Sequence, residues 1–156
     1  NSTEMKVTTL RCFCFAGAYL DPAHFVLGEF VLTALSNEDI VVHAGTGIYR
    51  SYLAVSDLAR QIYEMLIIST TRTSNYEVYN LGSDRAINLH DLASLVVKTL
   101  DSKSRVITPN PSATSVNYYI PNIECISTIM QIQYNSLENI ILSTAEYYKS
   151  KRFLSR

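Results

Sequence analysis

The sequence predicts a single α/β domain, and three observations lead to that fold class. Segments rich in β-branched and aromatic residues alternate with segments whose apolar residues recur at helical spacing. The chain has 156 residues, of which 47% are hydrophobic, which is enough for one core but short for two domains. The sequence contains no internal repeat, low-complexity tract or interdomain linker. Residues 1–156 are therefore expected to fold as one unit.

The first part of the chain predicts two strands and a helix before a glycine-containing turn. Residues 7–15 (VTTLRCFCF) are typical of a strand, which enters a turn at Ala16-Gly17. A helix is expected over about 24–36, and residues 39–43 (DIVVH) predict a short strand that ends at the AGTG turn. The apolar face of the helix is expected to be Leu27, Phe30, Val31, Ala34 and Leu35.

An extended segment, YRSYLAV, follows the turn and leads into a long helix. Ser56 is its expected N-cap, because a serine hydroxyl can accept a hydrogen bond from a free backbone N–H group. Polar residues 69–75 are expected to form the loop after it. The buried stripe of the helix is predicted to be Leu58, Ala59, Ile62, Tyr63, Leu66 and Ile67.

Residues 76–83 predict a strand that ends at Gly82-Ser83, and Gly82 is assigned to a tight turn. A helix over 87–100 follows, with Asn88 as its N-cap. Its inward-facing residues are expected to be Leu92, Leu95, Val96 and Leu100.

The rest of the chain predicts a short strand in RVITP, a proline-containing loop over 109–117 and two short helices. The last helix is expected from Ser136 to about Lys151.

Composition argues against several classes of function. Lysine and arginine number 13 against 14 acidic residues, so the chain lacks the cationic surface of a nonspecific nucleic-acid binder. No apolar run reaches the roughly 18 residues needed to cross a bilayer. We therefore expect neither a nucleic acid nor a membrane as partner.

The three cysteines indicate reduced thiols in a cytoplasmic protein. Cys12 and Cys14 lie two apart in a predicted strand, and we expect their side chains on opposite faces, where they cannot easily form a disulfide. No metal site is predicted, because there is no CxxC motif and the three histidines are far apart in sequence.

Four stretches, TLRCFCFAGAYL, GTGIYRSYLAVSDLA, YEVYNLGS and YYIPN, carry a resemblance to a known family. The most specific element is R-S-Y-x-x-V-x-D-L-A, from Arg50 to Ala59, joined to V-Y-N-x-G-S, from Val78 to Ser83. From about Thr8 to Tyr148 the chain resembles the C-terminal half of the NAD(P)-dependent nucleotide-sugar epimerases and dehydratases. These enzymes are extended short-chain dehydrogenases/reductases.

The resemblance implies the C-terminal portion of a Rossmann-like fold, with a small mixed sheet and several helices. In the family, the N-terminal half carries the dinucleotide loop and a catalytic Tyr-x-x-x-Lys pair. Here the first strand begins just past where that pair would lie, and the chain begins with Asn. We therefore expect the substrate-binding part alone, with NAD or NADP bound mainly by a missing half. No catalytic and no cofactor-binding residue is assigned to this chain.

Two local patterns imitate the missing parts. Gly45-Thr46-Gly47 follows a predicted strand, but a third glycine is lacking and a strand is expected next, whereas the dinucleotide fingerprint needs a helix N-terminus. Tyr147 and Lys151 have the catalytic spacing, but they lie at the end of a terminal helix among other polar residues. We interpret them as a solvated helix end.

Arg50 is the first candidate binding residue, and two interpretations remain open. A guanidinium stays charged and can hold a diphosphate through two parallel N–H groups. The resemblance implies that this position contacts the diphosphate of a nucleotide sugar. Alternatively, Arg50 forms an ion pair with Asp57, which lies seven residues on. Asp57 itself is interpreted as a structural carboxylate in the first turn of its helix.

Four further residues complete the predicted substrate site. The resemblance implies that His43 lies beside the nucleotide base, with a plain histidine at the edge of a strand as the alternative. It places Cys14 where many relatives have an asparagine. Cysteine is a poor hydrogen-bond donor, so that contact differs from the usual one. Tyr119 is expected to line the site through its ring and hydroxyl, with Tyr118 as the alternative. Asn80 is included because it lies at the carboxyl end of a strand, where α/β sheets bind ligands.

The expected partner is a nucleotide sugar. A competing hypothesis is a non-catalytic fragment or interaction module. A chain that lacks part of a sheet exposes strand edges and an apolar face, which predicts a homodimer or other self-association. An unrelated enzyme is not favoured, because no local motif indicates a Ser/His/Asp or Cys/His arrangement.

Overall fold

The structure of the chain is a computed structural model, which describes residues 5–43, 47–109 and 116–151. Within these ranges short strands alternate with helices, which confirms the α/β class. The strands are β1 (Val7–Cys12), β2 (Phe15–Ala16), β3 (Ile40–Val41), β4 (Ile48–Ser51), β5 (Leu53–Ala54), β6 (Tyr76–Leu81), β7 (Ala86–Asn88), β8 (Val106–Ile107) and β9 (Asn117–Tyr119). The helices are α1 (Val26–Leu35), α2 (Val55–Thr71), α3 (Leu89–Thr99), α4 (Glu124–Ser127) and α5 (Leu137–Ser150).

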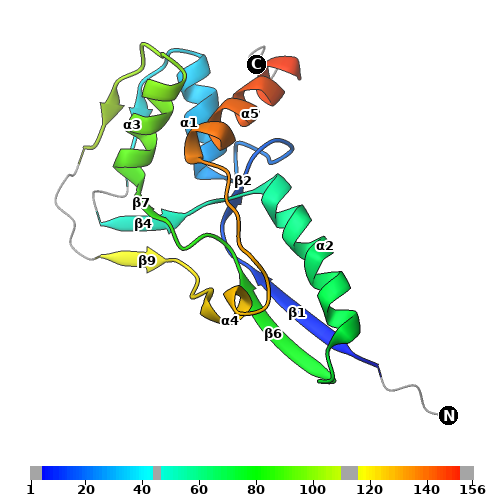
Figure 1. Cartoon of the computed structure of the whole chain (residues 1–156). Helices are drawn as coiled ribbons and strands as arrows, with labels where there is room; N and C mark the ends of the chain where they lie inside the picture. The colour runs from blue at the N-terminus through cyan, green and yellow to red at the C-terminus, as the bar shows by residue number, and fades with distance from the viewer. Residues whose placement is uncertain (1–4, 44–46, 110–115, 152–156) are drawn as a thin grey trace.

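The strands form small separate sheets. Strands β1 and β6 make a parallel pair, as do β2 with β5 and β3 with β8. Strand β4 is central in a mixed sheet, antiparallel to β7 on one side and parallel to β9 on the other. In Figure 1 the β1–β6 pair and α2 lie at the end near the N-terminus, while α1, α3 and α5 gather at the other end.

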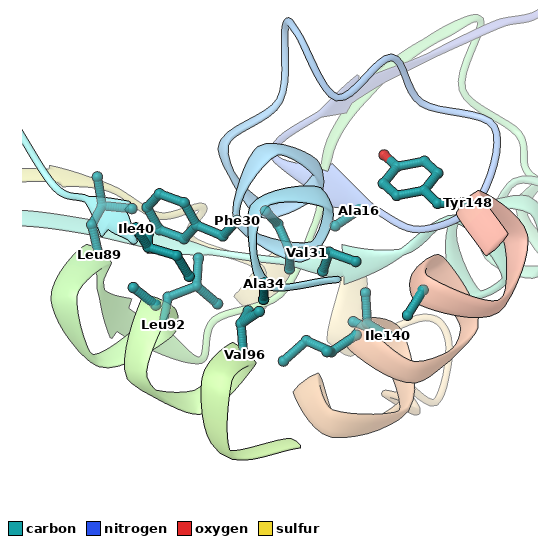
Figure 2. Packing of buried hydrophobic residues seen from close by; sticks show 14 of the residues in the cluster. Ala16, Phe30, Val31, Ala34, Ile40, Leu89, Leu92, Val96, Ile140 and Tyr148 are labelled. Carbon is teal, nitrogen blue, oxygen red and sulfur yellow. The ribbon is translucent and has the colours of Figure 1, made fainter. Parts of the chain in front are cut away.

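The larger apolar cluster lies between α1, α3 and α5. Phe30, Val31 and Ala34 of α1 pack towards α3 and α5, as Figure 2 shows, and they meet Leu92 and Val96 of α3. The predicted apolar faces of these two helices are thereby confirmed, with Leu35, Leu95 and Leu100 partly buried at the margin of the cluster. These contacts bring residues far apart in sequence into one core.

A second, smaller cluster lies beneath α2. Met65 of α2, Tyr79 and Leu81 of β6, and Ile126 and Met130 at α4 are its buried members. This cluster holds the β1–β6 pair, α2 and α4 together.

Of the two helix caps predicted from the sequence, Asn88 is confirmed and Ser56 is wrong, while Ser136 is a cap that was not predicted. The Asn88 side chain accepts a hydrogen bond from the backbone N–H of His90 at 2.8 Å, and the Ser136 hydroxyl accepts from Asn139. The prediction of Ser56 as a cap is wrong. Helix α2 begins one residue earlier, at Val55, and Ala54 occupies the cap position without a side-chain hydrogen bond.

The predicted buried stripe of α2 is also wrong. Tyr63 and Leu66 are each 64% exposed, and Ile62 and Ile67 are exposed as well. Ala59 is exposed too, and Leu58 is only partly buried. The buried residues are instead Asp57, Gln61 and Met65. Helical spacing shows that an apolar face exists, but tertiary contacts decide which face is covered.

Asp57 explains why this polar row faces inward. Its carboxylate accepts hydrogen bonds from the backbone N–H and the side-chain amide of Asn135, at 2.8 and 3.1 Å. The Arg60 guanidinium lies 3.4 Å from the same carboxylate and donates to the Gln133 carbonyl at 2.9 Å. The structural interpretation of Asp57 is therefore confirmed. The carboxylate fixes the segment before α5 against the start of α2, while Asp57 remains only 6% exposed.

Several boundaries differ from the sequence prediction. The single strand expected over 7–15 is divided into β1 and β2, which belong to different sheets. Strand β7 was not predicted, and the loop expected over 109–117 ends at Asn117, where β9 begins. Strands of two or three residues bury too little surface to produce a clear alternation in the sequence. Residues 110–115 of that loop lie outside the described part of the chain.

Among the helices of the described residues, none combines the length and the apolar character that crossing a membrane requires.

Gly82 lies at a bend directly after β6, and close packing is a further reason for glycine at this position. A Cβ atom at this position would lie 2.8 Å from Cγ of Pro121 and 3.0 Å from Cβ of Phe13. Its φ angle does not lie in the left-handed region that favours glycine. The proline ring and the Phe13 Cβ have little freedom to move, so a methyl group would strain this contact.

We predict that Gly82→Ala lowers the free energy of unfolding by about 1–3 kcal/mol, because the methyl group overpacks the contact with Pro121 and Phe13. Urea unfolding followed by circular dichroism measures the change. Ser94→Ala, at an exposed site on α3, is the control and should change stability by less than about 0.5 kcal/mol. Equal stability of Gly82→Ala and the parent chain would contradict this packing argument.

Candidate functional site

A cavity of about 490 Å³ lies where the end of β1, the segment before α1, and strands β4 and β9 come together. Its walls are mainly apolar and aromatic. The aromatic members are Phe13, Phe15, Phe25, Tyr52 and Tyr119. The aliphatic members are Ala16, Val26, Leu27, Ile48 and Leu89, and the remaining members are Cys12, Cys14, His24 and Arg50. Flat rings beside one guanidinium suit a ligand that has both a planar or apolar part and an anionic part.

Arg50 lines this cavity, and its geometry excludes one of the two interpretations left open by the sequence. Among the described residues, no carboxylate lies within ion-pair distance of Arg50, and the carboxylate of Asp57 is paired with Arg60. Nη1 of Arg50 donates to the Tyr49 carbonyl at 2.7 Å and to Oδ1 of Asn117 at 2.8 Å. The ion pair between Arg50 and Asp57 is therefore absent, and a cation borders the cavity.

Tyr119 also lines the cavity, and Tyr118 does not. The Tyr119 ring lies 5.0 Å from the Phe13 ring, between centroids, and the Arg50 guanidinium carbon is 5.9 Å from the Tyr119 centroid. Tyr118 stacks on Tyr49 with centroids 4.6 Å apart. Parallel pairing of β4 with β9 sets Arg50 opposite Tyr119 and Tyr49 opposite Tyr118, so each pair meets on its own face of the sheet.

Cys12 and Cys14 both border the cavity, so the prediction that they lie on opposite faces is wrong. Residues two apart in an extended segment share a face, so the spacing of Cys12 and Cys14 agrees with both of them bordering one cavity. The Cys14 carbonyl accepts the Leu53 N–H at 3.1 Å, which ties this segment to β5. Burial raises the pKa of the Cys14 thiol, while the nearby Arg50 charge opposes that rise.

Tyr52 is a lining residue that the sequence prediction missed. Burial, together with the neighbouring Cys14, raises the pKa of its hydroxyl well above the ordinary range. The hydroxyl therefore stays protonated and can donate a hydrogen bond. Tyr52 lies two residues after Arg50 in an extended segment, and this period-two spacing is the signal that could have identified it.

His43 and Asn80 are not brought to the cavity. His43 is exposed beyond β3, and Asn80 lies on β6 with its amide donating to the Asn122 carbonyl at 3.0 Å. The histidine that lines the cavity is His24, from the segment before α1. The structure thus gathers Arg50, Cys14 and Tyr119 of the predicted substrate site and leaves two of its members elsewhere.

Two other cavities have fewer charged and aromatic side chains in their walls. One of about 320 Å³ lies between the start of α2 and α5, and its one charged lining residue is Glu146. Another, of about 260 Å³, lies between β1 and α2 and is lined largely by apolar residues. Across the described residues, there is no group of three or more His, Cys, Asp or Glu side chains that could hold a metal ion.

The glycine pattern at 45–47 and the Tyr147/Lys151 pair lie next to ordinary strand and helix structure. Gly47 leads directly into strand β4, and Gly45 and Thr46 lie outside the described residues. Tyr147 is part-buried on α5, with its ring centroid 4.6 Å from that of Tyr19, and Lys151 directly follows that helix.

We predict that Cys14 reacts slowly with iodoacetamide at neutral pH, because burial disfavours the thiolate that performs the attack. The labelling rate of a Cys12→Ser/Cys125→Ser variant should rise with pH between about 7 and about 10, with its midpoint above that of the same variant in urea. The urea-unfolded protein is the control, because it lacks the burial. A folded-state midpoint at or below the unfolded one would show that the Arg50 charge dominates.

No protein-family model matches this chain, and no curated protein matches it. Solved structures do match. UDP-glucose 4-epimerase from Thermotoga maritima, solved with UDP-glucose, has a TM-score of 0.75 at 22% identity over 93% of this chain and 46% of its own. UDP-N-acetylglucosamine 4-epimerase from Methanobrevibacter ruminantium has a TM-score of 0.76 at 18% identity, over 96% of this chain and 48% of its own.

A third epimerase, UDP-glucose-4-epimerase from Stenotrophomonas maltophila with bound NAD, has a TM-score of 0.82 at 13% identity, over 98% of this chain and 50% of its own. The chain thus spans about half the length of the structures it matches. At these identities the likeness establishes the fold. The chain has the mixed α/β fold found in about half of each of these epimerases.

Proposed function

We propose that this chain is the substrate-binding part of an NAD(P)-dependent nucleotide-sugar epimerase, dehydratase or reductase. The cavity at the end of β1 binds the nucleotide sugar, and Arg50 holds its diphosphate. The ligand class is taken from the structures that share this fold, which were solved with nucleotide sugars such as UDP-glucose and UDP-N-acetylmuramic acid.

The main support for the proposal is the set of hydrogen bonds that the Arg50 guanidinium makes and leaves unmade. Within the described residues, its hydrogen bonds all come from Nη1, and no carboxylate neutralises it. Nε and Nη2 remain as one edge with parallel N–H groups, which is the geometry that grips a phosphate. Tyr52, Tyr119 and Phe25 supply flat surfaces in the same cavity. A nucleoside diphosphate presents both kinds of group to such a wall.

Under this proposal, chemistry and binding are divided between two parts of a larger enzyme. The residues described here do not fit a dinucleotide cofactor, because Gly47 leads into a strand and offers no helix N-terminus to a pyrophosphate. The cofactor and the catalytic Tyr/Lys pair therefore belong to a dinucleotide-binding part outside these residues. This chain contributes binding energy that orients the reacting sugar.

We predict that Arg50→Ala weakens nucleoside diphosphate binding by about tenfold to a hundredfold, because charged hydrogen bonds to phosphate are lost. Titration calorimetry with UDP, CDP and dTDP measures this, with the matching nucleosides as reference ligands. Arg11→Ala, at an exposed residue of β1, is the control for net charge. No diphosphate binding by the parent chain, or equal binding by Arg50→Ala, would refute the proposed function.

One observation favours a second candidate, a non-catalytic module that self-associates. The exposed outer face of α2 carries Ile62, Tyr63, Leu66 and Ile67. Beside it lies the hollow between α2 and β1, and within the described residues β1 is paired only with β6. An apolar helix face next to an unpaired strand edge is a surface that another polypeptide can cover. In the leading proposal the dinucleotide-binding part covers it, and in the second candidate another copy of this chain does.

For the second candidate we predict that the isolated chain forms dimers at micromolar concentration and that Leu66→Glu disrupts them. Placing a carboxylate on the α2 face adds a desolvation cost to its burial. Sedimentation velocity over a range of concentrations measures the dimer fraction. Leu142→Glu, which changes an exposed leucine of α5, is the matched control and should leave that fraction unchanged. A chain that remains monomeric throughout would exclude this candidate.

A further inference from the structure

Strand β9 restrains Arg50, the arginine of the cavity wall. Arg50 lies on β4, and its parallel neighbour β9 brings Asn117 and Tyr119 to it. Oδ1 of Asn117 accepts a hydrogen bond from Nη1 at 2.8 Å, and the Asn117 carbonyl lies 3.4 Å from the same nitrogen. Together with the Tyr49 carbonyl at 2.7 Å, these acceptors occupy both hydrogens of Nη1.

This arrangement fixes the direction of the rest of the guanidinium. Because the group is planar, holding Nη1 in place restricts rotation about the Cζ–Nε bond and sets the plane in which Nε and Nη2 lie. The Tyr119 ring, 5.9 Å from the guanidinium carbon, borders the same group. An arginine side chain otherwise loses much rotamer entropy when it binds an anion, so restraint before binding favours the complex.

The chemistry of the restraining residue matters as much as its position. The Asn117 amide oxygen accepts a hydrogen bond without bringing a negative charge, so the guanidinium keeps its full charge for an anion. An aspartate here would neutralise Arg50. Asn117 is also absent from the described lining of the cavity, so it affects a ligand in the cavity through Arg50.

We propose that Asn117 is a positioning residue that orients the Nε–Nη2 edge of Arg50 for the diphosphate of the ligand. This inference takes its ligand from the proposed function. The restraint of Arg50 by Asn117 is a property of the chain itself and can be tested without any ligand.

The binding test uses the full chain and whichever of UDP, CDP and dTDP binds it most tightly. Asn117→Ala should raise the Kd for that diphosphate about tenfold, as expected for losing a hydrogen bond to a charged group, and leave the Kd for the matching nucleoside unchanged. Asn139→Ala, which removes an exposed asparagine on α5, is the matched control. An equal loss of diphosphate and nucleoside binding, or no loss, would overturn the proposal.

The ligand-free test observes the Arg50 side chain by nuclear magnetic resonance. In the parent chain, slow rotation about Cζ–Nε should give separate Nη1 and Nη2 signals. In Asn117→Ala these signals should merge, and in Asn117→Asp, which keeps the Oδ1 acceptor, they should stay separate. Unchanged signals in Asn117→Ala would overturn the positioning role. If the parent chain binds no diphosphate, the proposed function fails, and this measurement alone still decides whether Asn117 restrains Arg50.

Discussion

The pairing of β4 with two distant partners is the interaction on which the cavity depends. Strand β7 binds one edge of β4, and β9, from nearly seventy residues further along the chain, binds the other. Backbone hydrogen bonds of this kind set the register of side chains along neighbouring strands. They determine that Arg50 lies opposite Tyr119 and that Asn88, the cap of α3, lies opposite Tyr49. One short strand thereby sets both the cation of the site and the start of a core helix.

The cavity keeps a positive charge at Arg50 because no carboxylate of the described residues pairs with this arginine. The chain has nearly balanced charge, and other arginines are paired: Arg60 with Asp57, Arg72 with Glu77 and Arg105 with Asp39. The Arg72 and Arg105 guanidinium groups hold the pKa values of their partner carboxyls below the usual range. Arg50 instead meets neutral acceptors and aromatic rings. A cation beside a largely apolar wall attracts anions more strongly than one in open water, because the effective dielectric constant is lower.

Helix α2 has opposite requirements on its two faces. The inner face carries Asp57 and Gln61, which is fully buried, and the side-chain amide of Gln61 has no partner among the described residues. The outer face carries four exposed large apolar side chains. A helix that folds only against this chain would gain by turning the other way, since burial of apolar surface is the main stabilising term. This orientation is the observation that supports the proposed contact of the outer face with another polypeptide.

The sequence by itself determined the elements with strong local signals. Regular apolar spacing identified α1 and α3, and the side chain of Asn88 marked the start of α3. Arg50, Cys14 and Tyr119, which the sequence predicted as binding residues, all line the same cavity. These features depend on residues near one another in the chain, so their chemistry is visible before folding.

Only the tertiary structure decided which faces are covered and which side chains meet. The exposure of the α2 stripe follows from the bond between Asp57 and Asn135, 78 residues apart, which no local pattern encodes. His43 lies two residues beyond β3 and Asn80 within β6, and neither borders the cavity. Asn117 lies in a segment that the sequence predicted as a polar loop. It contacts Arg50 only because β9 pairs with β4. Long-range contacts of this kind arise from packing and strand pairing, which the order of residues along the chain does not display.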